Sequence, residues 1–357
     1  MKKVGLLCGL LVPVLTGCFG VVPTASNLEH SRIEISMETP VQIRIFDIAC
    51  HEENKDERCG LLDRAFELIF DLERRWTVHD VGGEVERINE MAGIAPVVVE
   101  ADTFYLIEQA IYYSIDSDRL FNATIGPLTR MWNISMEGAR RPSDHEITAV
   151  LPLLDPTRVI MDAEASTVFL EEEGMRLDLG AIAKGYMADL VSALLTNNGI
   201  ERALLIIGGE VLAVGGRHEG TPFRVGIRTP FLEQHSDDLV GTLPLYNQAA
   251  VTSGTYNRYL ADQETRTIYH HIFDSRTGLP FDTDIISITV VADTGLLGEV
   301  YSTIVFALGV EKGMAYVEAH PHIEALLIST DNGIYLSSGL RDGFELILTD
   351  EFEIRTP

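Results

Sequence analysis

The chain has 357 residues, of which 46% are hydrophobic, and a formal net charge of −27. This composition excludes an intrinsically disordered chain, and the strong negative charge argues against nucleic acid or anionic lipid as a partner. The length predicts one large domain or two closely joined ones.

The first residues have the pattern of an export signal. Lys2 and Lys3 precede an apolar run over 4–14, and L-T-G-C follows at 15–18. This resembles a bacterial lipoprotein signal, in which residues 1–17 are removed and Cys18 is lipidated. The alternative is an ordinary cleaved signal with an incidental cysteine. We expect a periplasmic or otherwise extracytoplasmic protein, anchored to a bacterial membrane through Cys18, with residues 18–29 as a tether. Which membrane carries it stays open.

Two cysteines remain in the mature chain, Cys50 and Cys59. In an oxidising compartment they either form a disulfide or stay as two thiols, and the sequence leaves both open. A metal site is less favoured because no paired His or Cys ligands stand nearby.

Apolar periodicity predicts the elements in chain order. Strands are predicted within 32–47, helices at 61–76 and 103–117, and a helix capped by Ser143 within 140–155. A strand pair at 166–170 and 174–179 precedes a helix at 183–197. The remaining predictions are strands at 203–207, 211–214, 223–227, 249–252, 270–273 and 286–291, helices at 299–308 and 312–319, and strands at 325–329 and 333–337. This order predicts an α+β fold of mixed and antiparallel sheets with packed helices. We expect a single domain over residues 30–350, made of two closely packed lobes.

The stretch D-L-G-A-I-A-K-G-Y, residues 178–186, combines small residues with charges. Gly180 and Ala181 leave the backbone accessible after a predicted strand, and Lys184 can bring a positive charge to a phosphate at the start of a helix. Asp178 can accept hydrogen bonds from a ligand. The alternative is a tight strand-to-helix turn with a surface lysine.

The stretch T-G-L-L-G-E-V-Y-S-T, residues 294–303, places Glu299 and Thr303 on one helix face. A carboxylate and a hydroxyl together suit Mg²⁺. The alternative is a glutamate that the helix dipole favours near the N-terminus.

Two further stretches carry candidate chemistry. H-H-I-F-D-S-R-T-G-L-P, residues 270–280, offers a histidine as general base, and neighbouring strand residues point to opposite faces, so at most one histidine faces a given site. The alternative is a hairpin with surface histidines. V-T-S-G-T-Y-N-R-Y, residues 251–259, either lines a cleft or is simply a turn.

Four more motifs complete a pattern: M-E-T-P-V-Q-I from 37, W-T and E-V-E-R-I-N between 76 and 89, L-F-N-A-T-I-G-P-L-T-R-M-W from 120, and I-I-G-G-E-V from 206. In order and spacing, the eight motifs resemble the FAD:protein FMN transferases of the ApbE type. The resemblance implies an enzyme that binds FAD and Mg²⁺ and cleaves the pyrophosphate. It attaches FMN through a phosphoester to a threonine hydroxyl of an acceptor flavoprotein subunit, within a short threonine-containing motif, and releases AMP.

The resemblance also implies roles for individual residues. Ala181 (through its carbonyl), Glu299 and Thr303 match the metal positions. His271 matches the histidine that helps to activate the acceptor hydroxyl, and Lys184 faces phosphate. The positions that contact FAD are Met37, Trp76, Leu120, Phe121, Asn122, Asp178, Lys184 and Ile272.

Three residues depart from the family pattern. Glu299 stands where the family has aspartate, Asn122 ends R-L-F-N where the family has G-A-F-D, and Glu38 replaces the glycine of M-G-T. Mg²⁺ demands near-ideal geometry, so the longer Glu299 side chain bears on metal preference. Two other functions therefore stay open: a Mg²⁺-dependent FAD pyrophosphatase that gives FMN and AMP, and a non-catalytic flavin-binding lipoprotein.

Overall fold

The computed structural model describes residues 29–48, 50–51, 54–55, 57–78, 82–230, 238–262 and 266–356. The expected signal segment, Cys18 and nearly all of the expected tether lie outside the described residues. Within the described ranges, no helix is both long and apolar enough to cross a membrane.

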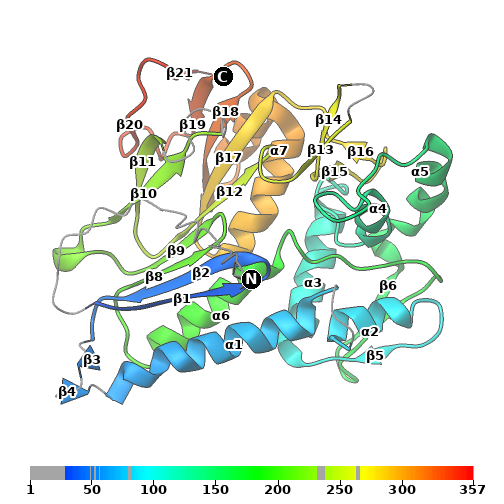
Figure 1. Ribbon diagram of the computed structural model, residues 1–357, viewed down its shortest axis with the longest axis horizontal. Coiled ribbons are helices and arrows are strands. Elements are labelled where there is room, and N and C mark those ends of the chain that lie inside the picture. The colour runs from blue at the N-terminus through cyan, green and yellow to red at the C-terminus, as the bar shows by residue number, and fades with distance from the viewer. Residues whose placement is uncertain are drawn as a thin grey trace, which may run out of the picture.

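A nine-stranded sheet forms the larger half of the molecule (Figure 1). Its order is β1-β2-β8-β9-β12-β17-β18-β19-β21, and every pairing is antiparallel except that of β19 with β21. Its central strands are buried on both faces, which explains their continuous apolar runs. The strands are β1 (His30–Ser36), β2 (Thr39–Ile45), β8 (Ala203–Ile207), β9 (Glu210–Val214), β12 (Ala249–Gly254), β17 (Ile285–Ala292), β18 (Ile323–Ser329), β19 (Gly333–Leu336) and β21 (Glu353–Arg355).

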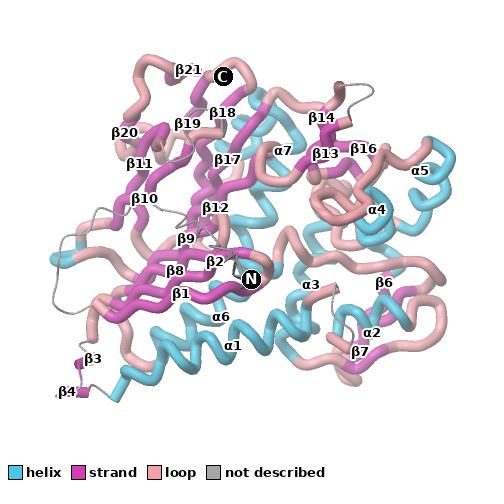
Figure 2. Tube along the Cα trace, viewed as in Figure 1, coloured by secondary structure: helices cyan, strands magenta, loops and turns pink. Residues whose placement is uncertain are grey.

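Helices cover one face of this sheet and a small sheet covers the other. On the first face pack α1 (Leu61–Trp76), α6 (Ala183–Asn197) and α7 (Gly295–Glu318). On the second face, β10 (Phe223–Arg228), β11 (Leu239–Leu245) and β20 (Glu345–Leu346) enclose a separate apolar core. Figure 2 shows the three helices together beside the large sheet.

The second half of the molecule holds one long helix, three short helices, and two- and three-stranded sheets, to the right in Figure 1. The helices are α2 (Glu84–Glu90), α3 (Ala101–Asp116), α4 (Gly126–Trp132) and α5 (Asp144–Val150). The strands are β5 (Val97–Val98), β6 (Val159–Asp162), β7 (Thr167–Leu170), β13 (Tyr259–Ala261), β14 (Ile268–His270), β15 (Phe273–Asp274) and β16 (Leu279–Pro280). The predicted α+β class, with mixed and antiparallel sheets, is confirmed.

Cys50 and Cys59 form a disulfide, with 5.8 Å between their Cα atoms. The bond joins the short strand β3 (Cys50–His51) to the turn of 3₁₀ helix at Glu57–Gly60, just before α1. It decides the question that the sequence left open.

The prediction of a strand at 174–179 is wrong, because the Asn89 side chain makes the hydrogen bonds that a partner strand would make. The side-chain amide of Asn89 donates to the carbonyl of Leu177 at 3.1 Å and accepts the Leu177 N–H at 2.6 Å. Strand β7 pairs instead with β5 and β6. The alternating apolar residues are buried as predicted, but the segment is not part of a sheet.

Four other predicted elements differ from the structure in where they end or divide. Ser143 and Glu146 form the expected capping box, but α5 ends at Val150, shortly before Pro152. The predicted strand 270–273 divides into β14 and β15, with two residues between them. The helices predicted at 299–308 and 312–319 are the two parts of α7, which breaks at Gly309, where φ is 77°.

Candidate active site

Two glycines bring α6 and α7 into backbone contact. A Cβ atom on Gly185 would overlap the carbonyl oxygen of Gly295. Asp189, one turn further along α6, accepts the first two backbone N–H groups of α7 at 2.7 and 3.0 Å. This contact fixes the start of α7 against α6 and places Lys184, next to Gly185, opposite the second turn of α7.

Lys184 and Glu299 meet at this contact. The Lys184 ammonium nitrogen lies 3.1 Å from Glu299 Oε1 and 3.0 Å from the carbonyl oxygen of Gly180. The Glu299 side chain is buried, with 6% of the residue exposed, and a buried carboxylate requires a nearby positive charge. Two residues from distant motifs, both singled out from the sequence, thus form one ion pair.

The other predicted metal donors adjoin this pair. Ala181 belongs to the turn that carries Gly180, and Thr303 is one helical turn beyond Glu299 and half-buried. A carbonyl, a hydroxyl and a carboxylate are the oxygen donors that Mg²⁺ prefers, so these residues fit that ion. The described part of the chain holds no cluster of three or more His, Cys, Asp or Glu side chains arranged to bind an ion.

Glu210 is a residue of this region that the sequence interpretation missed. It begins β9, is 1% exposed, and neither of its carboxylate oxygens has a hydrogen-bond partner in the described structure. A Cβ atom on Gly295 would overlap Glu210 Oε1. Burial, together with the charges of Glu299 and Asp189, raises the Glu210 pKa well above its ordinary value, and Lys184 opposes this shift. In the sequence, Glu210 appears only as one glutamate at the start of an apolar strand.

Asp189 has the same surroundings but is satisfied by hydrogen bonds. Burial raises its pKa to about 6, although the backbone N–H groups of α7 favour its charged form. The α6–α7 contact therefore brings the carboxyl groups of Asp189, Glu210 and Glu299 close enough to affect one another, with Lys184 paired to Glu299.

Asp178 ties the lysine turn to the motif that begins at Leu120. Its carboxylate accepts the Gly180 N–H at 2.9 Å and the Thr129 hydroxyl at 2.8 Å. Its own N–H donates to the carbonyl of Ala123 at 2.9 Å. The structure thereby brings the 120–124 and 178–184 segments together.

His271 lies between β14 and β15 and is held in one tautomer. Its Nδ1 is 3.1 Å from the carbonyl oxygen of Arg258, which can only accept, so Nδ1 carries the proton and Nε2 is the basic nitrogen. Burial lowers the His271 pKa to about 4, with smaller contributions from Arg258, His270 and Lys184. His271 is therefore a neutral imidazole at pH 7 and is close enough to Lys184 to feel its charge.

His270 has a structural role by contrast. Its Nε2 is 3.0 Å from the carbonyl oxygen of Phe281, and its ring meets Phe306 edge to face. The two adjacent histidines thus have different surroundings, as the sequence predicts.

The apolar positions predicted to contact FAD divide into two groups. Trp76 and Phe121 are core residues, each 2% exposed, and the Trp76 indole donates to Thr103 Oγ1 at 2.9 Å while stacking on Tyr186. Met37, Leu120 and Ile272 are half-buried at the edges of the apolar cores. Only this second group has appreciable surface to offer a flavin ring.

Two hollows, of about 370 and 420 Å³, lie on other parts of the chain. Both linings mix acidic and basic side chains, so neither has the single sign of charge that a phosphate or a cation favours. One is lined by residues including Arg32 and Asp63, and the other by residues including Asp47 and Arg202.

The model of the ApbE family matches residues 37–327. The chain belongs to this family. A FAD:protein FMN transferase from Klebsiella pneumoniae is 37% identical over 317 residues, which are 89% of this chain and 94% of that protein. A protein of the same name from Treponema pallidum is 31% identical over 94% of both chains. Among solved structures, the ApbE protein from Thermotoga maritima superposes with a TM-score of 0.77 at 25% identity, covering 87% of this chain and 97% of that one.

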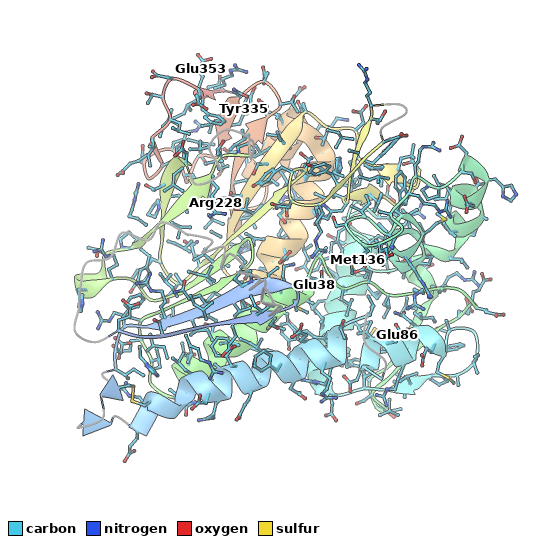
Figure 3. All side chains as sticks on the ribbon, in the orientation of Figure 1. Glu38, Glu86, Met136, Arg228, Tyr335 and Glu353 are labelled. Carbon is cyan, nitrogen blue, oxygen red and sulfur yellow. A yellow bond between two sulfur atoms is a disulfide. The ribbon has the colours of Figure 1, made fainter. Side chains whose placement is uncertain are left out.

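One departure from the ApbE pattern, Asn122, has a structural explanation, and a second, Glu38, stands in a conformation that does not favour its residue type. The Asn122 amide donates to the carbonyl of Leu154 at 2.8 Å, which a carboxylate cannot do, and its oxygen accepts both the N–H and the hydroxyl of Thr124. Glu38 has φ of 58° at the tip of the β1–β2 hairpin, a conformation that favours glycine. Figure 3 labels Glu38 between the large sheet and the second half of the molecule, where it lies 3.4 Å from Arg258.

Proposed function

We propose that this chain is a Mg²⁺-dependent FAD:protein FMN transferase. It cleaves the pyrophosphate of FAD, attaches FMN through a phosphoester to a threonine hydroxyl of an acceptor flavoprotein subunit, and releases AMP. The observation that carries the proposal is the Lys184–Glu299 pair at the α6–α7 contact, with Ala181 and Thr303 beside it. The chain's similarity to proteins named FAD:protein FMN transferase, over most of both lengths, supports the same assignment.

The residues divide the chemistry among them. Ala181, Glu299 and Thr303 would hold Mg²⁺, which when bound supplies positive charge to the pyrophosphate oxygens. The threonine oxygen forms a bond to the phosphorus of FMN while the bond from that phosphorus to the AMP oxygen breaks. His271 Nε2 takes the hydroxyl proton, and the Lys184 ammonium stabilises charge that grows on the departing phosphate.

We further propose that the enzyme acts outside the cytoplasm, anchored by lipid on Cys18. The signal pattern of residues 1–18 supports this location. The Cys50–Cys59 disulfide supports it independently, because disulfides persist mainly in oxidising compartments.

Replacing the metal carboxylate tests the enzyme assignment. With Glu299→Ala, we expect Mg²⁺-dependent release of AMP from FAD to fall by at least about a hundredfold, because the charge on the pyrophosphate is no longer neutralised. Glu311→Ala, an exposed glutamate of the same helix, is the matched control and should keep full activity. AMP released by the two variants is measured by chromatography. Undiminished release by Glu299→Ala would refute the metal assignment.

A further inference from the structure

The Lys184 ammonium contacts one of the proposed metal donors. It lies 3.1 Å from Glu299 Oε1, and Glu299 supplies the only carboxylate among those donors. It also lies 3.0 Å from the carbonyl oxygen of Gly180, in the same turn as Ala181, whose carbonyl is a second proposed donor. One positive group therefore already lies beside the carboxylate that a divalent cation would use.

The buried carboxyl groups around this point explain why a positive charge is needed when no metal is bound. Glu299 and Glu210 are 6% and 1% exposed, and Glu210 has no hydrogen-bond partner among the described residues. Removing the Lys184 ammonium from the buried Glu299 carboxylate would leave an uncompensated charge, which is strongly unfavourable. Lys184 thus neutralises part of this site.

An ammonium and a divalent cation that both contact the Glu299 carboxylate repel each other, since like charges at such a distance interact strongly. The lysine side chain has a flexible four-carbon stem and can move away without any change in the backbone. It begins in the first turn of α6, at the edge of the turn proposed to face phosphate.

We propose that the Lys184 ammonium takes the place of the metal ion beside Glu299 until a divalent ion binds. The divalent ion then displaces the ammonium toward the substrate phosphates. The inference rests on the proposed function for the identity of the ion and the phosphates. It has a thermodynamic consequence. Phosphates that attract the displaced ammonium strengthen metal binding, and the metal strengthens phosphate binding by the same factor.

Calorimetric titration of the flavin-free protein with Mg²⁺ tests the exchange. Lys184→Met keeps the length of the stem and removes the competing charge, so we expect it to bind Mg²⁺ at least about tenfold more tightly than the unmodified protein. Lys312→Met removes the same charge from an exposed position on α7 and should change the affinity less than about twofold.

Equal or weaker Mg²⁺ binding by Lys184→Met would overturn the proposal, because it would show that the lysine supports the metal rather than competing with it. If this variant fails to fold, Lys184→Gln takes its place with the same expectation, since glutamine keeps a hydrogen-bond donor for Glu299. AMP release by the unmodified protein is measured on the same preparation. If the unmodified protein cleaves FAD but Lys184→Met binds Mg²⁺ with unchanged affinity, only the exchange is rejected. If Lys184→Met binds Mg²⁺ more tightly but the unmodified protein does not cleave FAD, only the enzyme assignment is rejected.

Discussion

The histidine assigned as the general base is prepared for that role before any substrate binds. The Arg258 carbonyl fixes the proton on Nδ1, and burial keeps the ring neutral by lowering the pKa to about 4. Since a base must be unprotonated to accept a proton, His271 is competent at any pH well above this value.

The lowered pKa of His271 predicts an unusual pH profile. The unprotonated form predominates above the pKa of about 4, so kcat/KM for transfer should stay constant between about pH 8 and pH 5.5. An unperturbed histidine would instead lose activity near its ordinary pKa of about 6.5. Rates measured across this range would contradict the assignment if they fell by half near pH 6.5. His271→Gln should lower transfer by about a hundredfold or more at every pH in the range.

Individual residues could be predicted from the sequence only where a motif marked them. Lys184 and Glu299 were identified in separate motifs, but their 3.1 Å contact depends on helix packing that no local pattern reveals. Glu210 was missed because one glutamate in an apolar strand gives no sign of how deeply it is buried. One hydrogen bond of the Asn122 amide likewise depends on Leu154, more than thirty residues away.

At the scale of elements, the glycines of the lysine motif do more than expose the backbone to a ligand. Gly185 is a helical residue whose missing side chain allows α6 to touch the first residue of α7. Glycine within a helix costs about 1 kcal/mol relative to alanine, and the close approach explains its presence here.

Adding a methyl group at this contact should damage both stability and activity. Gly185→Ala is expected to lower the free energy of unfolding by about 1–3 kcal/mol and to reduce Mg²⁺-dependent AMP release, because it separates Lys184 from Glu299. Gly60→Ala is the matched control, since φ is −73° there and a Cβ atom would meet nothing within 4 Å. Urea unfolding gives the stabilities, and equal values for the two variants would show that the contact does not position α7.

Helices with a sustained apolar face were predictable, whereas two of the seven-residue helices were not. The predicted bounds of α1 and α6 agree with the structure because each helix buries a sustained apolar face. Helices α2 and α4 have seven residues each, or about two turns, and were not predicted. The 174–179 segment shows the converse error, because Asn89 satisfies the Leu177 backbone in place of a neighbouring strand.

For the whole molecule, the class of fold could be predicted but the assembly of the site could not. Alternating strands and periodic helices indicated an α+β chain with antiparallel sheets. The site, however, joins the hairpin tip at Met37, the 120–124 turn, the start of α6, His271 and α7, which come from both halves of the molecule (Figure 1). In the sequence, only the order and spacing of the motifs indicated that these segments act together.

The disulfide contributes to global stability rather than to catalysis. It closes a short loop between cysteines nine positions apart, so replacing both with serine should lower the free energy of unfolding by about 2–3 kcal/mol. Reducing the unmodified protein should produce a similar loss in urea unfolding, while the reductant should leave the double variant unchanged. AMP release at 25 °C should be preserved in both. Equal stability of the oxidised and reduced protein would contradict this role.

The most direct measurement follows the acceptor itself. The chain from residue 19 onward would be incubated with FAD and a protein carrying the threonine-containing motif, with and without Mg²⁺, and the mass of the acceptor measured by mass spectrometry. We predict that the acceptor gains one FMN only when Mg²⁺ is present, and that the Glu299→Ala variant gives no such product. An unmodified acceptor alongside free FMN and AMP would contradict the transferase account in favour of a pyrophosphatase, and unchanged FAD would leave a flavin-binding lipoprotein.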